Sequence, residues 1–173
     1  IGLFAMQSAK ALGAAAVYVA DLDPWRLALA EKLGASGIIN VGQESLQDGL
    51  ARLAGGHKEI DVFLDCVGEK GKVMDLILQL ARRGTRIVMV GVLQKEYSLP
   101  HLPDFVQHEL SLFGTTMYVP QDYREMIDLM GRGKIRTAGM ITHTFPLSDL
   151  PKVFAMIEAR QEPFFKIMLT VGA

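Results

Sequence analysis

The sequence predicts an α/β fold built on a doubly wound parallel sheet. Apolar, β-branched runs of strand length alternate with amphipathic stretches of helical length from the start of the chain to about residue 117. The runs are nearly continuous in Val, Ile and Leu, which predicts strands buried on both faces between two layers of helices. The units differ in length and no motif recurs at a fixed period, so a repeat architecture is not indicated.

The opening residues, "IGLFAMQSAKALGA" (1–14), predict a helix because their apolar side chains recur at helical spacing. No Ser, Thr, Asp or Asn precedes Ile1 to cap the first turn, and the chain does not begin with Met. We therefore expect that the chain was cut from a longer protein and that the fold lacks its first strand.

The remaining elements follow in alternation. Strands are expected at 14–21, 36–41, 60–68 and 84–92. Helices are expected between them at 23–34, 44–55 and 69–84. The helix at 23–34 is well delimited, since Pro24 stands in its first turn and Gly34 at its C-terminal end.

The pattern changes after Val92. Residues 93–105 carry two prolines and no clean period, which predicts a loop on the rim of the sheet. A last strand at 110–117 and a helix at 121–132 follow. Beyond Gly133 we expect a short extended piece, a helix opened by "SDLP" and a final strand at 165–171. We therefore expect one domain at 1–117 and a C-terminal segment, 118–173, that belongs to a second domain.

Composition and charge exclude several classes of partner. Half of the 173 residues are hydrophobic, and 18 Lys and Arg nearly balance 19 Asp and Glu, giving a net charge of -1. No basic run indicates nucleic acid, and no apolar stretch reaches the roughly 18 residues of a membrane span. The single cysteine, Cys66, excludes an internal disulfide and a cysteine-only zinc site. We expect a cytoplasmic protein that binds neither nucleic acid nor membrane.

Gly2 and Asp21 fit the pattern of a dinucleotide-binding fold. There the third glycine of G-x-G-x-x-G opens a helix, and an acidic residue about 20 positions later binds the ribose hydroxyls. Gly2 can be that third glycine, and Asp21 follows the next expected strand. Glycines near helix starts and aspartates after strands are also common for reasons of packing and turn formation, so the pair alone leaves that plainer interpretation open.

Longer matches point to one family. The runs that carry the resemblance, in order, are "IGLFAMQSAKALGAAAVYVADLDPWRLALAEKLGAS", "IDVFLDCVG", "GTRIVMVGV" and "FFKIML". The chain resembles the zinc-dependent alcohol, polyol and threonine dehydrogenase branch of the medium-chain dehydrogenase/reductase family. The resemblance implies that 1–117 is an NAD-binding Rossmann domain and that 118–173 returns to the catalytic domain. It also implies that the zinc ligands belong to an absent N-terminal domain, so no catalytic residue or metal ligand is expected here.

The same resemblance implies a cofactor site. Gly2 matches the glycine beside the pyrophosphate, Asp21 the acidic ribose ligand, Arg26 a side chain near the adenosine end, and Lys166 a basic side chain that reaches the pyrophosphate. Further matched residues follow later strands and line the adenine, ribose and nicotinamide sides: Cys66, Val67, Gly68, Val90, Gly91, Val92, Thr115 and Met117. Ligands of open α/β sheets bind outside the carboxyl ends of the strands, where Asp21, Cys66 and Gly91 are predicted.

The expected activity of the whole enzyme is hydride transfer between NAD and a secondary alcohol or ketone. A carboxylate at Asp21 would repel a 2′-phosphate, which favours NAD over NADP, although Arg26 is a nearby cation that would weaken this repulsion. The chain alone is expected to be inactive, with zinc bound outside it. An apolar edge strand at 110–117 predicts a homodimer. Two alternatives stay open: a zinc-free NADPH reductase of the quinone oxidoreductase type, and a non-catalytic, free-standing nucleotide-binding module.

Overall fold

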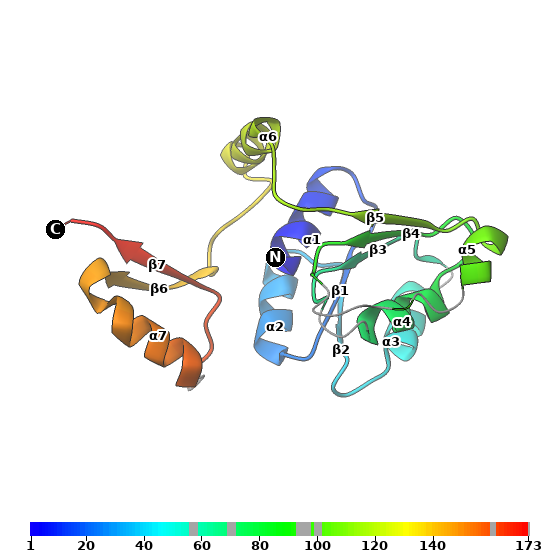
Figure 1. Ribbon diagram of the computed structural model, residues 1–173, viewed down its shortest axis with the longest axis horizontal. Coiled ribbons are helices and arrows are strands. Elements are labelled where there is room, and N and C mark those ends of the chain that lie inside the picture. The colour runs from blue at the N-terminus through cyan, green and yellow to red at the C-terminus, as the bar shows by residue number, and fades with distance from the viewer. Residues whose placement is uncertain (56–58, 69–71, 93–97, 99–101, 160–161, 173) are drawn as a thin grey trace. The chain divides into compact units, whose positions relative to one another are not determined.

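The computed structural model describes residues 1–55, 59–68, 72–92, 98, 102–159 and 162–172. The chain forms two compact units, Ile1–Ile135 and Arg136–Ala173, whose folds are visible in Figure 1. The division falls after Ile135, whereas the sequence predicted a domain boundary after Met117. The assignment of 118–173 to a catalytic domain stays a prediction.

The first unit contains the predicted alternation of helices and strands. Its elements are α1 (Gly2–Ala11), β1 (Tyr18–Asp21), α2 (Pro24–Lys32), β2 (Gly37–Asn40), α3 (Leu46–Ala54), β3 (Val62–Asp65), α4 (Lys72–Leu80), β4 (Arg86–Met89), α5 (Leu102–Gln107), β5 (Ser111–Gly114) and α6 (Pro120–Gly131). The strands are shorter than the predicted ranges. The start of the predicted 69–84 helix and most of the predicted 93–105 loop lie outside the described residues.

All described strand pairs in this unit are parallel. Tyr18 of β1 stands opposite Gly37 of β2, and β3, β4 and β5 pair in that order. Among the described residues, β1 and β3 do not pair with each other, so the unit holds a two-stranded and a three-stranded sheet. In the strand order of a doubly wound fold, the first strand of the sheet lies between the strands that correspond to β1 and β3 here. The break therefore falls where the predicted missing first strand would lie. Parallel sheets with flanking helices confirm the predicted α/β fold class.

Two apolar clusters hold the helices against the strands. Ile39 of β2 packs with Leu50 of α3 and Leu80 of α4. Ile87 of β4 packs with Met74 and Ile77 of α4. All six of these residues are almost fully buried. Figure 1 shows α3 and α4 together on one side of β1 and β2, with α1 and α2 on the other.

Two predictions about this unit are wrong. The strands are not buried on both faces, since Leu64 of β3 is 40 % exposed and Phe113 of β5 is 49 % exposed. Phe63, the residue before Leu64 in β3, packs against both apolar clusters. Only alternate side chains of this strand are therefore turned toward the helices. The second error is α5, which occupies part of the predicted loop. Pro103 did not prevent this helix because it is the second helical residue, where its missing N–H is not needed.

The second unit consists of β6 (Ile141–Pro146), a 3₁₀ turn (Leu147–Asp149), α7 (Leu150–Ala159) and β7 (Lys166–Thr170). β6 and β7 are parallel, with a register shift between Ile141 and His143. The helix and final strand predicted for this part of the chain are present. Nowhere in the described parts of either unit is there a helix both long and apolar enough to cross a membrane.

Candidate functional site

Asp65, the last residue of β3, binds two turns that follow neighbouring strands. Its carboxylate Oδ1 accepts hydrogen bonds from the backbone N–H groups of Val67 (2.9 Å) and Gly68 (3.0 Å). Its backbone carbonyl accepts two more, both at 2.8 Å, from the N–H groups of Val90 and Gly91. One residue therefore fixes both the turn after β3 and the turn after β4.

The two turns touch through glycine. A Cβ atom added to Gly68 would lie 2.5 Å from the carbonyl oxygen of Val92, and one added to Gly91 would lie 2.3 Å from the Gly68 nitrogen. Gly68 also adopts a φ of 71°, in the left-handed region that favours glycine. These backbones can approach only because neither residue carries a side chain.

The start of α1 lies beside the first of these turns. A Cβ atom added to Gly2 would stand 3.9 Å from the Cβ of Cys66, and no side chain caps this helix. The structure thus places Gly2 beside Cys66 of the first turn, and the first turn in contact with the second. This group consists of Gly2, Cys66, Val67, Gly68, Val90, Gly91 and Val92.

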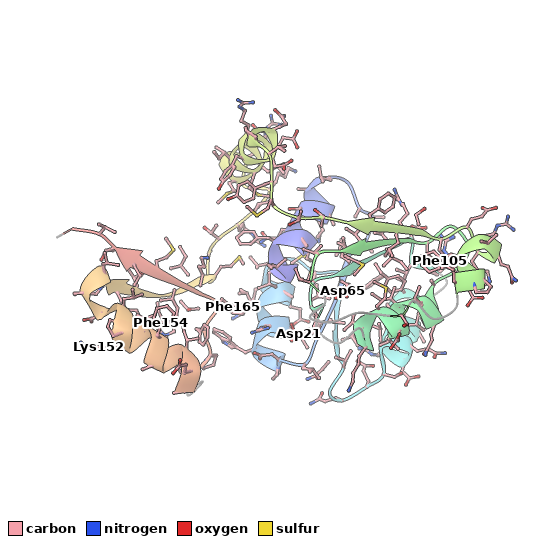
Figure 2. All side chains as sticks on the ribbon, in the orientation of Figure 1. Asp21, Asp65, Phe105, Lys152, Phe154 and Phe165 are labelled. Carbon is pink, nitrogen blue, oxygen red and sulfur yellow. The ribbon has the colours of Figure 1, made fainter. Side chains whose placement is uncertain are left out.

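Asp21 and Arg26 form a second group at the end of β1. Asp21 Oδ1 accepts a hydrogen bond from the Asp23 N–H at 3.0 Å. Asp23 in turn caps α2 by accepting from the Trp25 N–H, so this turn is fixed on both sides. Arg26 Nη1 lies 4.0 Å from Asp21 Oδ2, and the Asp21 side chain is 33 % exposed. Figure 2 labels Asp21 and Asp65, the residues that end β1 and β3.

The three other predicted site residues are less constrained. The Thr115 N–H donates to the Met89 carbonyl at 3.1 Å and so extends the β4–β5 ladder. Met117 has a φ of 56° and an exposed side chain. Lys166 is the first residue of β7 and belongs to the other compact unit, within which it is exposed.

Sequence reasoning missed Asp65. Asp65 is 1 % exposed, and none of the described residues offers its buried Oδ2 a hydrogen-bond partner. A signal was present in the sequence, because an Asp at the end of an apolar strand and three residues before a Gly is typical of an Asx turn. The quoted segment "IDVFLDCVG" contains that arrangement.

The match to known proteins covers most of this unit. The family model described as "Zinc-binding dehydrogenase" matches residues 1–132. The chain belongs to the zinc-binding dehydrogenase family. This confirms the family resemblance seen in the sequence.

Individual dehydrogenases are similar over most of the chain. L-idonate 5-dehydrogenase of Vitis vinifera is 32 % identical over 176 residues, which cover 99 % of this chain and 47 % of the relative. Sorbitol dehydrogenase and L-threonine 3-dehydrogenase are among the other relatives. The chain spans about half the length of the curated relatives it matches.

Two similar crystal structures carry different cofactors. A short chain alcohol dehydrogenase from Escherichia coli CFT073, complexed with NADH, is 26 % identical with a TM-score of 0.83, covering 98 % of this chain and 49 % of that one. A zinc-binding dehydrogenase from Sinorhizobium meliloti 1021, bound to NADP, is 27 % identical with a TM-score of 0.78, covering 99 % and 48 %. Dinucleotides of both kinds therefore occur among structural neighbours of this zinc-binding dehydrogenase chain.

The described residues do not fit a zinc ion. None of them forms a group of three or more His, Cys, Asp or Glu side chains that could hold a metal. Burial, with a smaller contribution from Asp65, raises the pKa of the free Cys66 thiol. A raised pKa disfavours the thiolate that a metal requires. The zinc implied by the family name has no site among the described side chains.

Proposed function

We propose that this chain is the cofactor-binding portion of a zinc-dependent alcohol or polyol dehydrogenase that transfers a hydride between NAD and a secondary alcohol or ketone. The observation that supports NAD most directly is the position of Asp21 at the carboxyl end of β1. A carboxylate there accepts two hydrogen bonds from a ribose diol and repels a 2′-phosphate. The activity, the substrates and the cytoplasmic location are proposals for the whole protein.

The described residues fit a dinucleotide. The uncapped start of α1, with Gly2, offers N–H groups and a positive dipole end to the pyrophosphate. The turns at 66–68 and 90–92 would line the adenosine and nicotinamide sides of the cofactor. Gly68 and Gly91 allow the backbones of these two turns to lie close together. In this proposal Arg26 lies near the adenosine, and Thr115 and Met117 meet the carboxamide end. The match of Lys166 to a pyrophosphate ligand rests on the family resemblance alone.

The chemistry is divided between the cofactor and the rest of the enzyme. A bound NAD would supply the hydride acceptor for oxidation of the carbon that bears the alcohol. The residues of this chain bind and orient the cofactor, and none of them is proposed to act on the substrate oxygen. We therefore expect no alcohol oxidation by the isolated chain and no stoichiometric zinc in it, which elemental analysis and turnover assays would check.

Calorimetric titration with NAD and NADP tests the proposal. We expect the purified protein to bind NAD roughly tenfold to a hundredfold more tightly than NADP, since placing a 2′-phosphate against a carboxylate costs on the order of 1 to 3 kcal/mol. Asp21→Ala should remove most of that preference. Preference for NADP in the wild-type protein would instead favour the zinc-free reductase alternative.

Asp23→Asn is the matched control for Asp21→Ala. It removes a carboxylate two residues away but keeps a side-chain oxygen that can accept from the Trp25 N–H and cap α2. The control should keep the preference for NAD. Equal loss of preference in both variants would mean that general charge in this loop, and not a specific contact of Asp21, decides between the two nucleotides.

A further inference from the structure

We propose that Asp65 is a positioning residue that couples the two glycine turns and presents their backbones together to the dinucleotide. This inference rests on the proposed function. It starts from a buried carboxylate that the binding of NAD, as set out above, does not use. Asp65 is 1 % exposed, and Figure 2 labels it where β3 ends.

The bonds of Asp65 reach both turns. Its Oδ1 holds the N–H groups of Val67 and Gly68, and its carbonyl holds those of Val90 and Gly91. Four consecutive ladder pairs, ending with Asp65 opposite Met89, fix the two strands that carry these turns. A displacement of either turn would therefore break bonds to the residue that also holds the other.

The close approach of Gly68 and Gly91 makes this coupling tight. Because each glycine stands where a Cβ would overlap the backbone of the opposite turn, one turn cannot shift toward the other without a clash. Two turns that share one anchor and are in contact have few independent conformations, and preorganisation of this kind lowers the entropic cost of binding. The anchor is the side chain and carbonyl of Asp65.

Within the described parts of the chain the buried Oδ2 of Asp65 has no hydrogen-bond partner, and burying such an oxygen costs free energy of folding. Oδ1 alone makes the two side-chain bonds to the turn after β3. An asparagine at the same position would keep that oxygen and the two bonds, whereas an alanine would lose both. The pair of substitutions therefore separates hydrogen bonding from negative charge.

The test compares wild type, Asp65→Ala and Asp65→Asn by NAD calorimetry and by amide hydrogen exchange. Near-ultraviolet circular dichroism verifies that each variant is folded. We expect Asp65→Ala to weaken NAD binding by at least tenfold and to speed exchange at Val67, Gly68, Val90 and Gly91 together. Asp65→Asn should stay within about threefold of wild type in affinity and should keep slow exchange at these four amides.

Asp61→Ala is the control, because Asp61 lies just before β3, at the opposite end of the same strand, and its side chain is exposed and paired with Arg82. It should leave the affinity and the four exchange rates unchanged.

The proposal would be overturned if Asp65→Ala kept the NAD affinity and the amide exchange rates of the wild type. Loss of NAD binding in a folded Asp65→Asn would also overturn it. If Asp65→Ala does not fold, the Asn variant alone decides. A wild-type protein that does not bind NAD would overturn the proposed function, and exchange at the four amides would still decide whether Asp65 orders both turns.

Discussion

Arg26 lies between two carboxylates at the start of α2, with its Nη1 4.0 Å from Asp21 Oδ2 and its Nε 3.5 Å from Asp23 Oδ2. The Arg26 side chain is 54 % exposed, so neither pair is strongly shielded from water. The guanidinium nevertheless lies beside the one carboxylate that is proposed to discriminate between the two nucleotides. It is therefore expected to modulate that discrimination.

Arg26→Ala should increase the preference for NAD. Without the guanidinium, no nearby positive charge offsets the repulsion between the Asp21 carboxylate and a 2′-phosphate. NADP affinity should therefore fall by about threefold to tenfold more than NAD affinity. Calorimetric titration with both nucleotides measures this change. The free energy of unfolding should change by less than about 0.5 kcal/mol, because exposed ion pairs contribute little. An unchanged or reduced ratio would show that Arg26 does not influence the 2′-position.

Gly91→Ala should destabilise the protein more than Gly114→Ala does. A Cβ at Gly91 would overlap the Gly68 backbone at 2.3 Å, whereas a Cβ at Gly114 meets nothing within 4 Å. Neither glycine has a positive φ, so the comparison isolates the steric clash. Overlap with backbone atoms is expected to cost about 2 to 4 kcal/mol. Urea denaturation measures the difference, and equal midpoints for the two variants would contradict the tight contact between the turns.

The sequence predicted correctly that β1 ends at Asp21 because local signals mark this position, whereas the predicted ends of the later strands in this unit lie beyond the observed ones. The run before Asp21 is apolar and β-branched, and Pro24 begins a helix directly afterwards, so the position of this carboxylate follows from a few neighbouring residues. Gly68 and Gly91 were instead predicted as site residues from the family resemblance, because the local pattern placed both inside the expected strands 60–68 and 84–92. The position of Asp21 at the end of its strand was therefore accessible to sequence reasoning.

Contacts between distant segments were not accessible in the same way. Whether Gly68 and Gly91 touch depends on the register of β3 against β4, and no local pattern encodes that register. The role of Asp65 depends on the same pairing, since its carbonyl bonds Val90 and Gly91 across the sheet. Exposure of Leu64 was also missed, because hydrophobicity alone does not tell which face of a short apolar strand is covered.

The edge strand β5 supports the prediction of a homodimer through residues 110–117. Among the described residues β5 pairs only with β4, so its other edge carries backbone groups without a strand partner. Leu112 and Phe113 on this strand are 38 % and 49 % exposed, although both are large and apolar. An apolar edge strand of this kind favours pairing with a second copy of the chain across a two-fold axis.

Phe113→Lys should therefore shift the protein from dimer to monomer. A lysine on an edge strand places a charge in the interface and opposes strand pairing, while the exposed position lets the folded monomer tolerate it. Val106→Lys is the matched control, since Val106 is 81 % exposed on α5, outside the proposed interface, and should leave the dimer intact. Light scattering at micromolar protein concentration distinguishes the two masses. A Phe113→Lys variant that still dimerises would show that the dimer forms through another surface. A monomeric wild type would contradict the predicted homodimer.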